Sequence, residues 1–129
     1  MTARLFFAIA TLMSGLAVAG GAFAAHALKS QLTEKALTTF EPGIRYQMYH
    51  GLALLAVAIL LYQAMAESSW LTIAGWSFII GILLFSGSLY GLSLSGIKWL
   101  GAITPLGGVA FLIGWISLGL SSLGMQALR

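Results

Sequence analysis

The 129-residue chain is too apolar to be a soluble domain. Hydrophobic residues make up 60% of it and charged residues 7%, whereas roughly 25% of a typical soluble domain is charged. So few charges could not cover a soluble surface, so the expected solvent is the lipid bilayer. The net charge of +3 comes without a basic run, so nucleic acid is not an expected partner. Cysteine is absent, which excludes disulfides, thiolate metal sites and cysteine nucleophiles.

Long uncharged stretches predict four transmembrane helices in a single domain, residues 1–129. A spanning helix needs about 20 mostly apolar residues. We therefore expect an all-α integral membrane four-helix bundle, with spans near 5–25, 46–66, 71–93 and 101–123. The first stretch resembles a cleavable secretory signal, but it is long enough to span and is expected to remain as the first helix.

The connection between the first two spans also has helical character. Leu32, Leu37 and Phe40 recur at helical spacing among polar residues, which predicts a short amphipathic helix over 33–40 in the membrane interface. Thr33 is the expected N-cap of this helix. Pro42-Gly43 is expected to end it, with Pro42 opening the second span at its first position.

Small residues predict where the helices approach one another, because lipid tails are as apolar as leucine and close backbone contact drives association instead. The candidate positions are Ala17, Gly21, Ala25, Gly87, Gly91, Ser95, Gly107, Gly108 and Gly114. We expect most of them to pack within the bundle. Gly87 and Gly91, which fit the GxxxG pattern, are also the expected face of a possible homo-oligomer.

The distribution of positive charge predicts an orientation. Four spans put both termini on one side of the membrane and residues 26–45 and 94–100 on the other. The second side carries Lys29, Lys35, Arg45 and Lys98, against Arg4 and Arg129 on the first. Positive residues favour the cytoplasm, so the two connections are expected there and both termini on the opposite side.

Polar side chains gather at the end of the bundle that carries these connections. The candidate ligand- or partner-binding residues are His26, Glu41, Arg45, Tyr46, Tyr49, His50, Ser86, Tyr90 and Thr104. Several have structural alternatives. The tyrosines suit an interfacial aromatic belt, and Glu41 suits a structural ion pair with Arg45.

The two histidines leave more than one hypothesis open. His26 and His50 could form structural hydrogen bonds, or they could ligate a metal ion or a b-type haem, although no cofactor is the leading expectation. No catalytic constellation is recognisable: there is no Gly-x-Ser-x-Gly elbow and no glycine loop with lysine for phosphate. The chain is therefore not expected to be an enzyme.

Several blocks of sequence resemble a known family. They are Gly21-Ala22-Phe23-Ala24-Ala25-His26-Ala27-Leu28, Phe40-Glu41-Pro42-Gly43-Ile44-Arg45-Tyr46-Gln47-Met48-Tyr49-His50, Phe85-Ser86-Gly87-Ser88-Leu89-Tyr90 and Gly101-Ala102-Ile103-Thr104-Pro105-Leu106-Gly107-Gly108. Together they are similar to the small four-helix membrane proteins of unknown function typified by YgdD and YwdK (domain of unknown function 423). The resemblance implies a four-helix protein of the bacterial inner membrane and implies no activity.

The leading hypothesis is a non-enzymatic binding or structural membrane protein with a polar site at one membrane face. Membrane lipids are the expected partners. One alternative is a protein that binds a metal or haem b through its histidines. The other is an oligomeric pore or carrier for small solutes.

Overall fold

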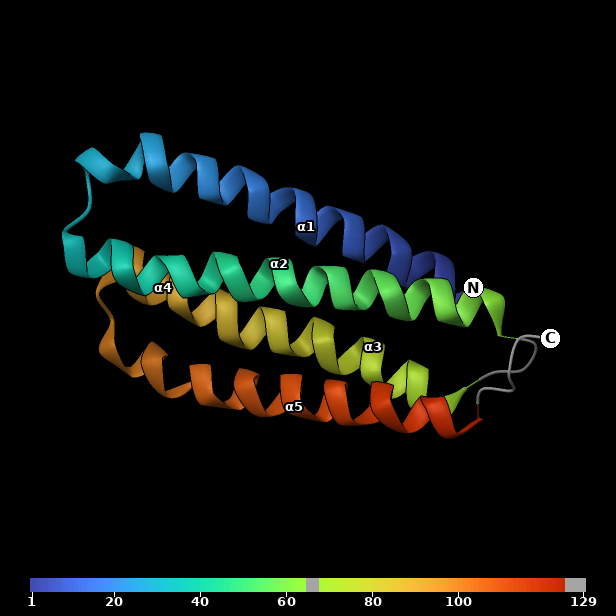
Figure 1. The fold of residues 1–129 in the computed structure, drawn as a ribbon. Coiled ribbons are helices and arrows are strands. Elements are labelled where there is room, and N and C mark those ends of the chain that lie inside the picture. The colour runs from blue at the N-terminus through green and yellow to red at the C-terminus, as the bar shows by residue number, and fades with distance from the viewer. Residues whose placement is uncertain (65–67, 125–129) are drawn as a thin grey trace.

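The computed structural model describes residues 1–64 and 68–124, and its long helices run back and forth along one axis (Figure 1). Four helical segments are long and apolar enough to cross a membrane: Thr2–Ser30, Glu34–Gln63, Ser69–Ser95 and Lys98–Gly124. This confirms the expected all-helical, four-span architecture. Two parts of the predictions lie outside the described residues: the end of the second span at 65–66, and Arg129.

The four segments contain nine helical elements within the described residues. In chain order they are α1 (Thr2–His26), η1 (Leu28–Ser30), α2 (Glu34–Gln63), α3 (Ser69–Gly81), η2 (Ile82–Ser86), α4 (Gly87–Ser95), η3 (Lys98–Ala102), α5 (Thr104–Ser121) and η4 (Ser122–Gly124). The third span is thus α3 and α4 joined through η2, a π-helical turn. Gly96 follows α4 in the left-handed conformation, with φ of 72°, which a glycine adopts without strain.

The second span begins earlier than the sequence predicts. Thr33 is the N-cap, as expected, and its side chain accepts a hydrogen bond from the Ala36 backbone N–H. The predicted break at Pro42-Gly43 is wrong, because α2 runs unbroken through Pro42. The predicted interfacial helix over 33–40 is therefore the first part of the second spanning helix.

Tertiary packing explains why Pro42 does not end the helix. A proline inside a helix removes one hydrogen bond and crowds the preceding turn. On either side of it, Phe40 and Gly43 are buried. The Phe40 ring lies 4.8 Å from the Tyr90 ring of α4, and Gly43 lies beneath the same tyrosine. These contacts hold both sides of Pro42 against α4 and outweigh the local helix-breaking preference.

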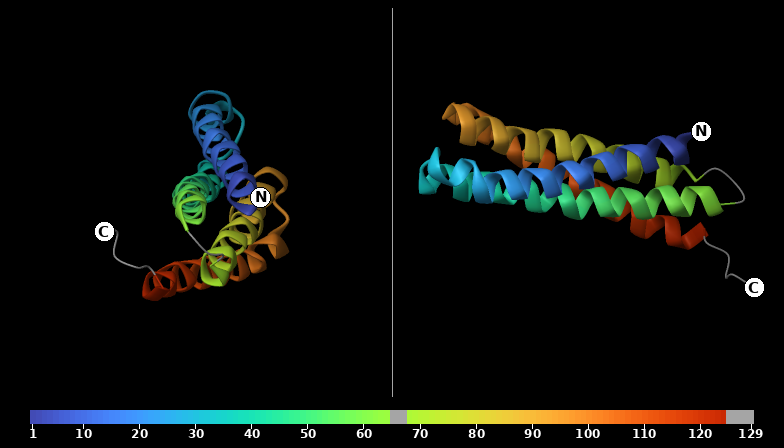
Figure 2. Two further views of the ribbon diagram at one scale, coloured as in Figure 1. Left: turned by 90° about the vertical axis from the view of Figure 1, so that its right-hand side faces the viewer. Right: turned by 90° about the horizontal axis from the view of Figure 1, so that it is seen from above.

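The helices pack mainly with their neighbours in the chain. The end-on view in Figure 2 shows α1 and α5 at opposite edges, with α2 and the third span between them. Burial agrees: in an apolar 18-residue stretch of each span, 39% of the residues are buried for both middle spans, against 17% for the first span and 22% for the fourth. Large faces of α1 and α5 are therefore left to lipid or to partners.

Glycines allow the close approaches, and most of these glycines receive an aromatic ring. Phe6 lies over Gly75, Phe111 over Gly81, Phe78 over Gly114 and Tyr90 over Gly43. The expectation of packing holds for Gly107 and Gly114 but not for Gly87 and Gly108, which have no atom within 4 Å of a Cβ position. A Cβ on Gly91 would lie 3.0 Å from Leu100 Cδ1, so Gly87 and Gly91 do not form one open face.

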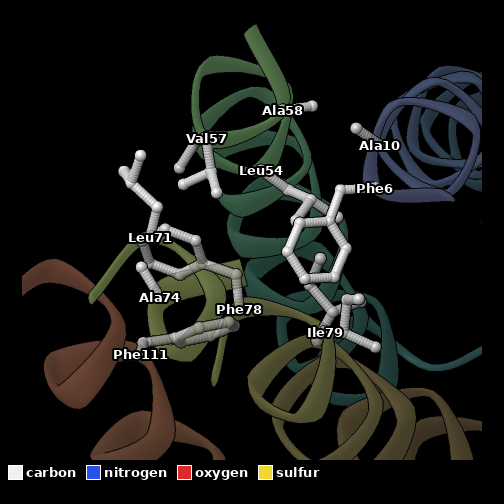
Figure 3. Close-up of a cluster of buried hydrophobic side chains, with 12 residues drawn as sticks. Phe6, Ala10, Leu54, Val57, Ala58, Leu71, Ala74, Phe78, Ile79 and Phe111 are labelled. Carbon is white, nitrogen blue, oxygen red and sulfur yellow. The ribbon is translucent and has the colours of Figure 1, made fainter. Parts of the chain in front are cut away.

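Apolar and polar contacts occupy different halves of the molecule. The apolar core contains Phe6 and Ala10 of α1, much of α3, Phe111 of α5, and four residues of α2: Ala53, Leu54, Val57 and Ala58. Figure 3 shows these side chains meeting between the four helices. Buried polar side chains lie mostly in the other half, toward η1 and η3, and this is where the candidate site belongs.

Candidate functional site

Gln47 joins three helices at the centre of the polar half. Its side-chain Nε2 donates to the Met13 carbonyl of α1 at 2.8 Å, and its Oε1 accepts from the Tyr90 hydroxyl of α4 at 2.6 Å. Gln47 is only 5% exposed, so these bonds are formed away from water. A buried amide must be hydrogen-bonded to avoid a large desolvation cost, and this one is bonded at both ends.

The π-helical turn η2 is held from both sides. Ser86 donates its hydroxyl to the Gly43 carbonyl of α2 at 2.6 Å, in a fully buried contact. On the other side, a Cβ on Gly107 of α5 would lie 2.3 Å from the Phe85 backbone nitrogen. One turn further along, the hydroxyls of Ser88 and Thr104 are hydrogen-bonded at 2.7 Å. Hydrogen bonds and backbone packing therefore fix the irregular turn between α2 and α5.

His50 lies near the middle of α2, not at the start of a span. Its Nδ1 is 2.7 Å from the Tyr46 carbonyl, and its Nε2 is 3.1 Å from the indole Nε1 of Trp115 on α5. A carbonyl only accepts and an indole N–H only donates. His50 is therefore the neutral tautomer with its proton on Nδ1, and both ring nitrogens already have partners.

Aromatic stacking completes the surroundings of His50. The imidazole is parallel to the Phe111 ring at 3.4 Å between centroids, with an interplanar angle of 6°. The Tyr46 ring is stacked against the His50 ring at 5.9 Å between centroids and lies tilted beside the Phe85 ring at 4.7 Å. This aromatic cluster fills the space between α2 and α5, so His50 acts here as a packed hydrogen-bonding group.

The structure does not bring the two histidines together. Gly51 of α2 packs against Ser14 of α1, so its neighbour His50 lies at the level of Ser14 along the bundle. His26 is exposed about three turns farther along α1, a distance of about 18 Å. Among residues 1–64 and 68–124, no group of three or more His, Cys, Asp or Glu side chains could hold a metal ion.

The remaining charged and aromatic candidates lie on the outside of α2. Glu41 and Arg45 form a two-point ion pair one turn apart, with Nε donating to Oε1 at 3.0 Å and the second guanidinium nitrogen donating to Oε2. This is the pairing that the sequence suggested. Tyr49 is 54% exposed beside Tyr46, so its surface is available to the surrounding medium.

A groove of about 260 Å³ lies beside the Gln47–Tyr90 pair. It is lined by Met13, Leu16, Gly20, Phe40, Gln47, Ile82, Leu83, Gly87 and Tyr90. Gly87, which has an empty Cβ position, leaves room on the α4 side of the groove. The groove is mostly apolar, and Gln47 and Tyr90 are its two polar side chains.

The candidate residues predicted from the sequence include most of these side chains, but that list leaves out three residues that connect them: Gln47, Ser88 and Trp115. Gln47 had a usable signal, because an uncharged amide in a span must find internal partners. Ser88 and Trp115 had none, since serine and tryptophan are also common at helix surfaces and membrane interfaces.

Comparison with known proteins extends over nearly the whole chain. Residues 20–108 match the family described as "Protein of unknown function (DUF423)". The "UPF0382 membrane protein YwdK" of Bacillus subtilis is 48% identical over 113 residues, which cover 88% of this chain and 91% of that protein. A "UPF0382 membrane protein" of Haemophilus influenzae is 43% identical over 123 residues, covering 95% and 97%. No solved structure matches. The chain is a membrane protein that belongs to the DUF423 family.

Proposed function

We propose that this protein is a non-enzymatic lipid-binding protein, and that the groove beside Gln47 and Tyr90 holds an acyl chain. The observation that carries the proposal is the composition of the groove: a mostly apolar channel with one amide and one phenol. An amphiphile needs this combination, because its chain requires apolar walls and its ester or hydroxyl requires hydrogen-bonding partners.

The bonding capacity of the two polar groups supports this choice. A glutamine amide has two N–H donors and a carbonyl with two lone pairs. Gln47 uses one donor for the Met13 carbonyl and one lone pair for Tyr90. One amide N–H and the phenol oxygen's acceptor capacity therefore remain for a ligand. The ester carbonyl of a lipid can accept from the first, and a lipid hydroxyl can donate to the second.

The expected depth in the bilayer suits a lipid ligand. We place one membrane boundary at Arg4 and Tyr62, which border the same groove at the start of α1 and the end of α2. A hydrocarbon core of about 30 Å corresponds to about 20 helical residues, which reaches roughly Pro42 on α2. Gln47 then lies about 8 Å inside the opposite boundary. This depth is close enough to the membrane surface for the ester and hydroxyl groups of a lipid to reach Gln47.

Native mass spectrometry of gently released protein tests the proposal. The variant that blocks the groove is Gly87→Leu: its Cβ meets no atom within 4 Å, so the backbone tolerates a side chain there, and the rest of the leucine occupies groove space. Gly119→Leu on α5 is the matched control, because it is equally open but lies away from the groove. We expect Gly87→Leu to lose most of the retained lipid and Gly119→Leu to keep it.

Two results would count against this function. Equal lipid retention by the two variants would show that the groove is not the binding site. A wild-type dimer that Gly87→Leu converts to a monomer, without bound lipid in either, would instead support the homo-oligomer hypothesis.

We further propose that the protein lies in the bacterial inner membrane with η1 and η3 facing the cytoplasm. The excess of Lys and Arg in these connections supports this orientation. Because the chain has no cysteine, single-cysteine variants can test it. We expect a membrane-impermeant maleimide added to spheroplasts to label Ser122→Cys, and to label Lys35→Cys only after permeabilisation. The reverse pattern would invert the orientation.

A further inference from the structure

A second groove lies at the opposite end of the molecule, between the start of α1 and the end of α2. Its volume is about 270 Å³, and it is lined by Ala3, Arg4, Phe7, Ala58, Ile59 and Tyr62. We infer that this groove is a binding site for an anionic phospholipid, with the phosphate at Arg4 and one acyl chain along the apolar wall. It is separate from the proposed groove at Gln47, with which it shares no lining residue.

Charge complementarity identifies the occupant. Arg4 is the one charged side chain at this end among the described residues, and it is exposed at the rim of the groove. A guanidinium presents several N–H donors in a planar fork, which matches two oxygens of a phosphate. The Arg45 guanidinium at the other end is already occupied by Glu41. Of the two arginines that the structure describes, Arg4 is thus the one whose surroundings suit an external anion.

The remainder of the groove suits the other parts of a phospholipid. Phe7 and Ile59 are 49% and 45% exposed, so the wall beside Arg4 offers apolar surface to an acyl chain. Tyr62 also lines the groove and is 79% exposed, so its hydroxyl is free to donate to a phosphate or glycerol oxygen of a bound lipid. A free phosphate would use Arg4 alone, whereas a phospholipid uses the cation and the apolar wall together.

The test compares two lipids with identical acyl chains, phosphatidylglycerol and phosphatidylcholine, added to the full-length protein in detergent. Native mass spectrometry measures the fraction of protein that retains each lipid. One cation near an anionic headgroup favours binding by about fivefold, so the wild type is expected to prefer phosphatidylglycerol by about that factor. Arg4→Gln should lose the preference, and Arg4→Lys should keep most of it.

Two further variants separate the site from general surface charge. Lys98→Gln removes an exposed cation at the opposite end and should leave the preference intact. Ile59→Trp fills the groove without changing any charge, so it should reduce the retention of both lipids. The inference is overturned if the wild type retains both lipids equally, if Arg4→Gln keeps the preference, or if Lys98→Gln abolishes it as fully as Arg4→Gln does. Gly87→Leu should not affect this site, so the two lipid proposals fail independently.

Discussion

Gly107 and Gly108 are consecutive residues of α5 with opposite surroundings, and this makes them a matched pair for testing the packing. A Cβ on Gly107 would lie 2.3 Å from the Phe85 nitrogen and 2.7 Å from its Cα, both backbone atoms of η2. A Cβ on Gly108 would meet nothing within 4 Å. Alanine at 107 must therefore push two backbones apart, whereas alanine at 108 needs no movement.

The difference in stability between the two variants can be worked out from these contacts. Ordinary contact begins near 3.4 Å, so α5 must move from η2 by about 1 Å, and overpacking of this kind costs about 1–3 kcal/mol. The same movement weakens the Ser88–Thr104 hydrogen bond, and interhelical bonds in membranes contribute about 0.6 kcal/mol on average. The gain in helix propensity, about 1 kcal/mol for Gly→Ala, is common to both variants and cancels. Gly107→Ala should therefore be about 2–4 kcal/mol less stable than Gly108→Ala.

Unfolding in mixed micelles with increasing SDS, followed by tryptophan fluorescence, measures this difference in the free energy of unfolding. Circular dichroism before denaturation checks that both variants begin from the same helical content. Equal stability of the two alanine variants would refute the inferred backbone contact between α5 and η2. Greater stability of Gly107→Ala would refute it more strongly.

Two hydrogen bonds give further expected outcomes. Tyr90→Phe removes the hydroxyl that donates to Gln47, so it should lower the free energy of unfolding by about 0.6 kcal/mol, up to about 1.7. Tyr62→Phe, which loses an exposed hydroxyl, should change it less, and equal effects would argue against the Gln47 bond. Nitrogen-15 NMR should show His50 protonated on Nδ1 alone in the wild type. Trp115→Phe removes the indole N–H that donates to Nε2, so the Nε2 resonance should shift while the proton stays on Nδ1 beside the Tyr46 carbonyl; an unchanged Nε2 resonance would contradict the Trp115 contact.

The overall architecture could be predicted because membrane insertion acts on local composition. Charged residues such as Arg4, Lys29 and Lys98 are costly within a bilayer, so the stretches between them approximate the spans without knowledge of any contact. The Thr33 N-cap is a similarly local feature, since its partner lies three residues away. Both predictions depend on neighbours in the sequence, and both are confirmed.

Predictions that depended on distant contacts were less successful. Pro42 has a strong local preference to end a helix, yet Phe40 and Gly43 pack against Tyr90, more than 40 residues away in the chain. No local pattern reveals that contact. The prediction of packing positions from small residues had the same weakness, because Gly87 and Gly107 were both candidates, yet Gly87 faces open space and Gly107 faces a backbone. The π-helical turn that brings Ser86 to α2 was also not predictable, since it depends on the same distant partners.

Hydrogen-bonding capacity separates the structural polar residues from those suited to binding. His50 was the most conspicuous candidate in the sequence, but both of its nitrogens are occupied, by Tyr46 and Trp115. In this arrangement the Nε2 lone pair, which a metal ion would need, already accepts the Trp115 N–H, and the Nδ1 proton already donates to the Tyr46 carbonyl. Gln47, by contrast, retains an amide N–H beside a groove that adjoins Gly87. The two residues therefore differ in role: His50 holds α5 to α2 through Trp115, whereas Gln47 joins α1, α2 and α4 at the edge of the groove for which lipid binding is proposed.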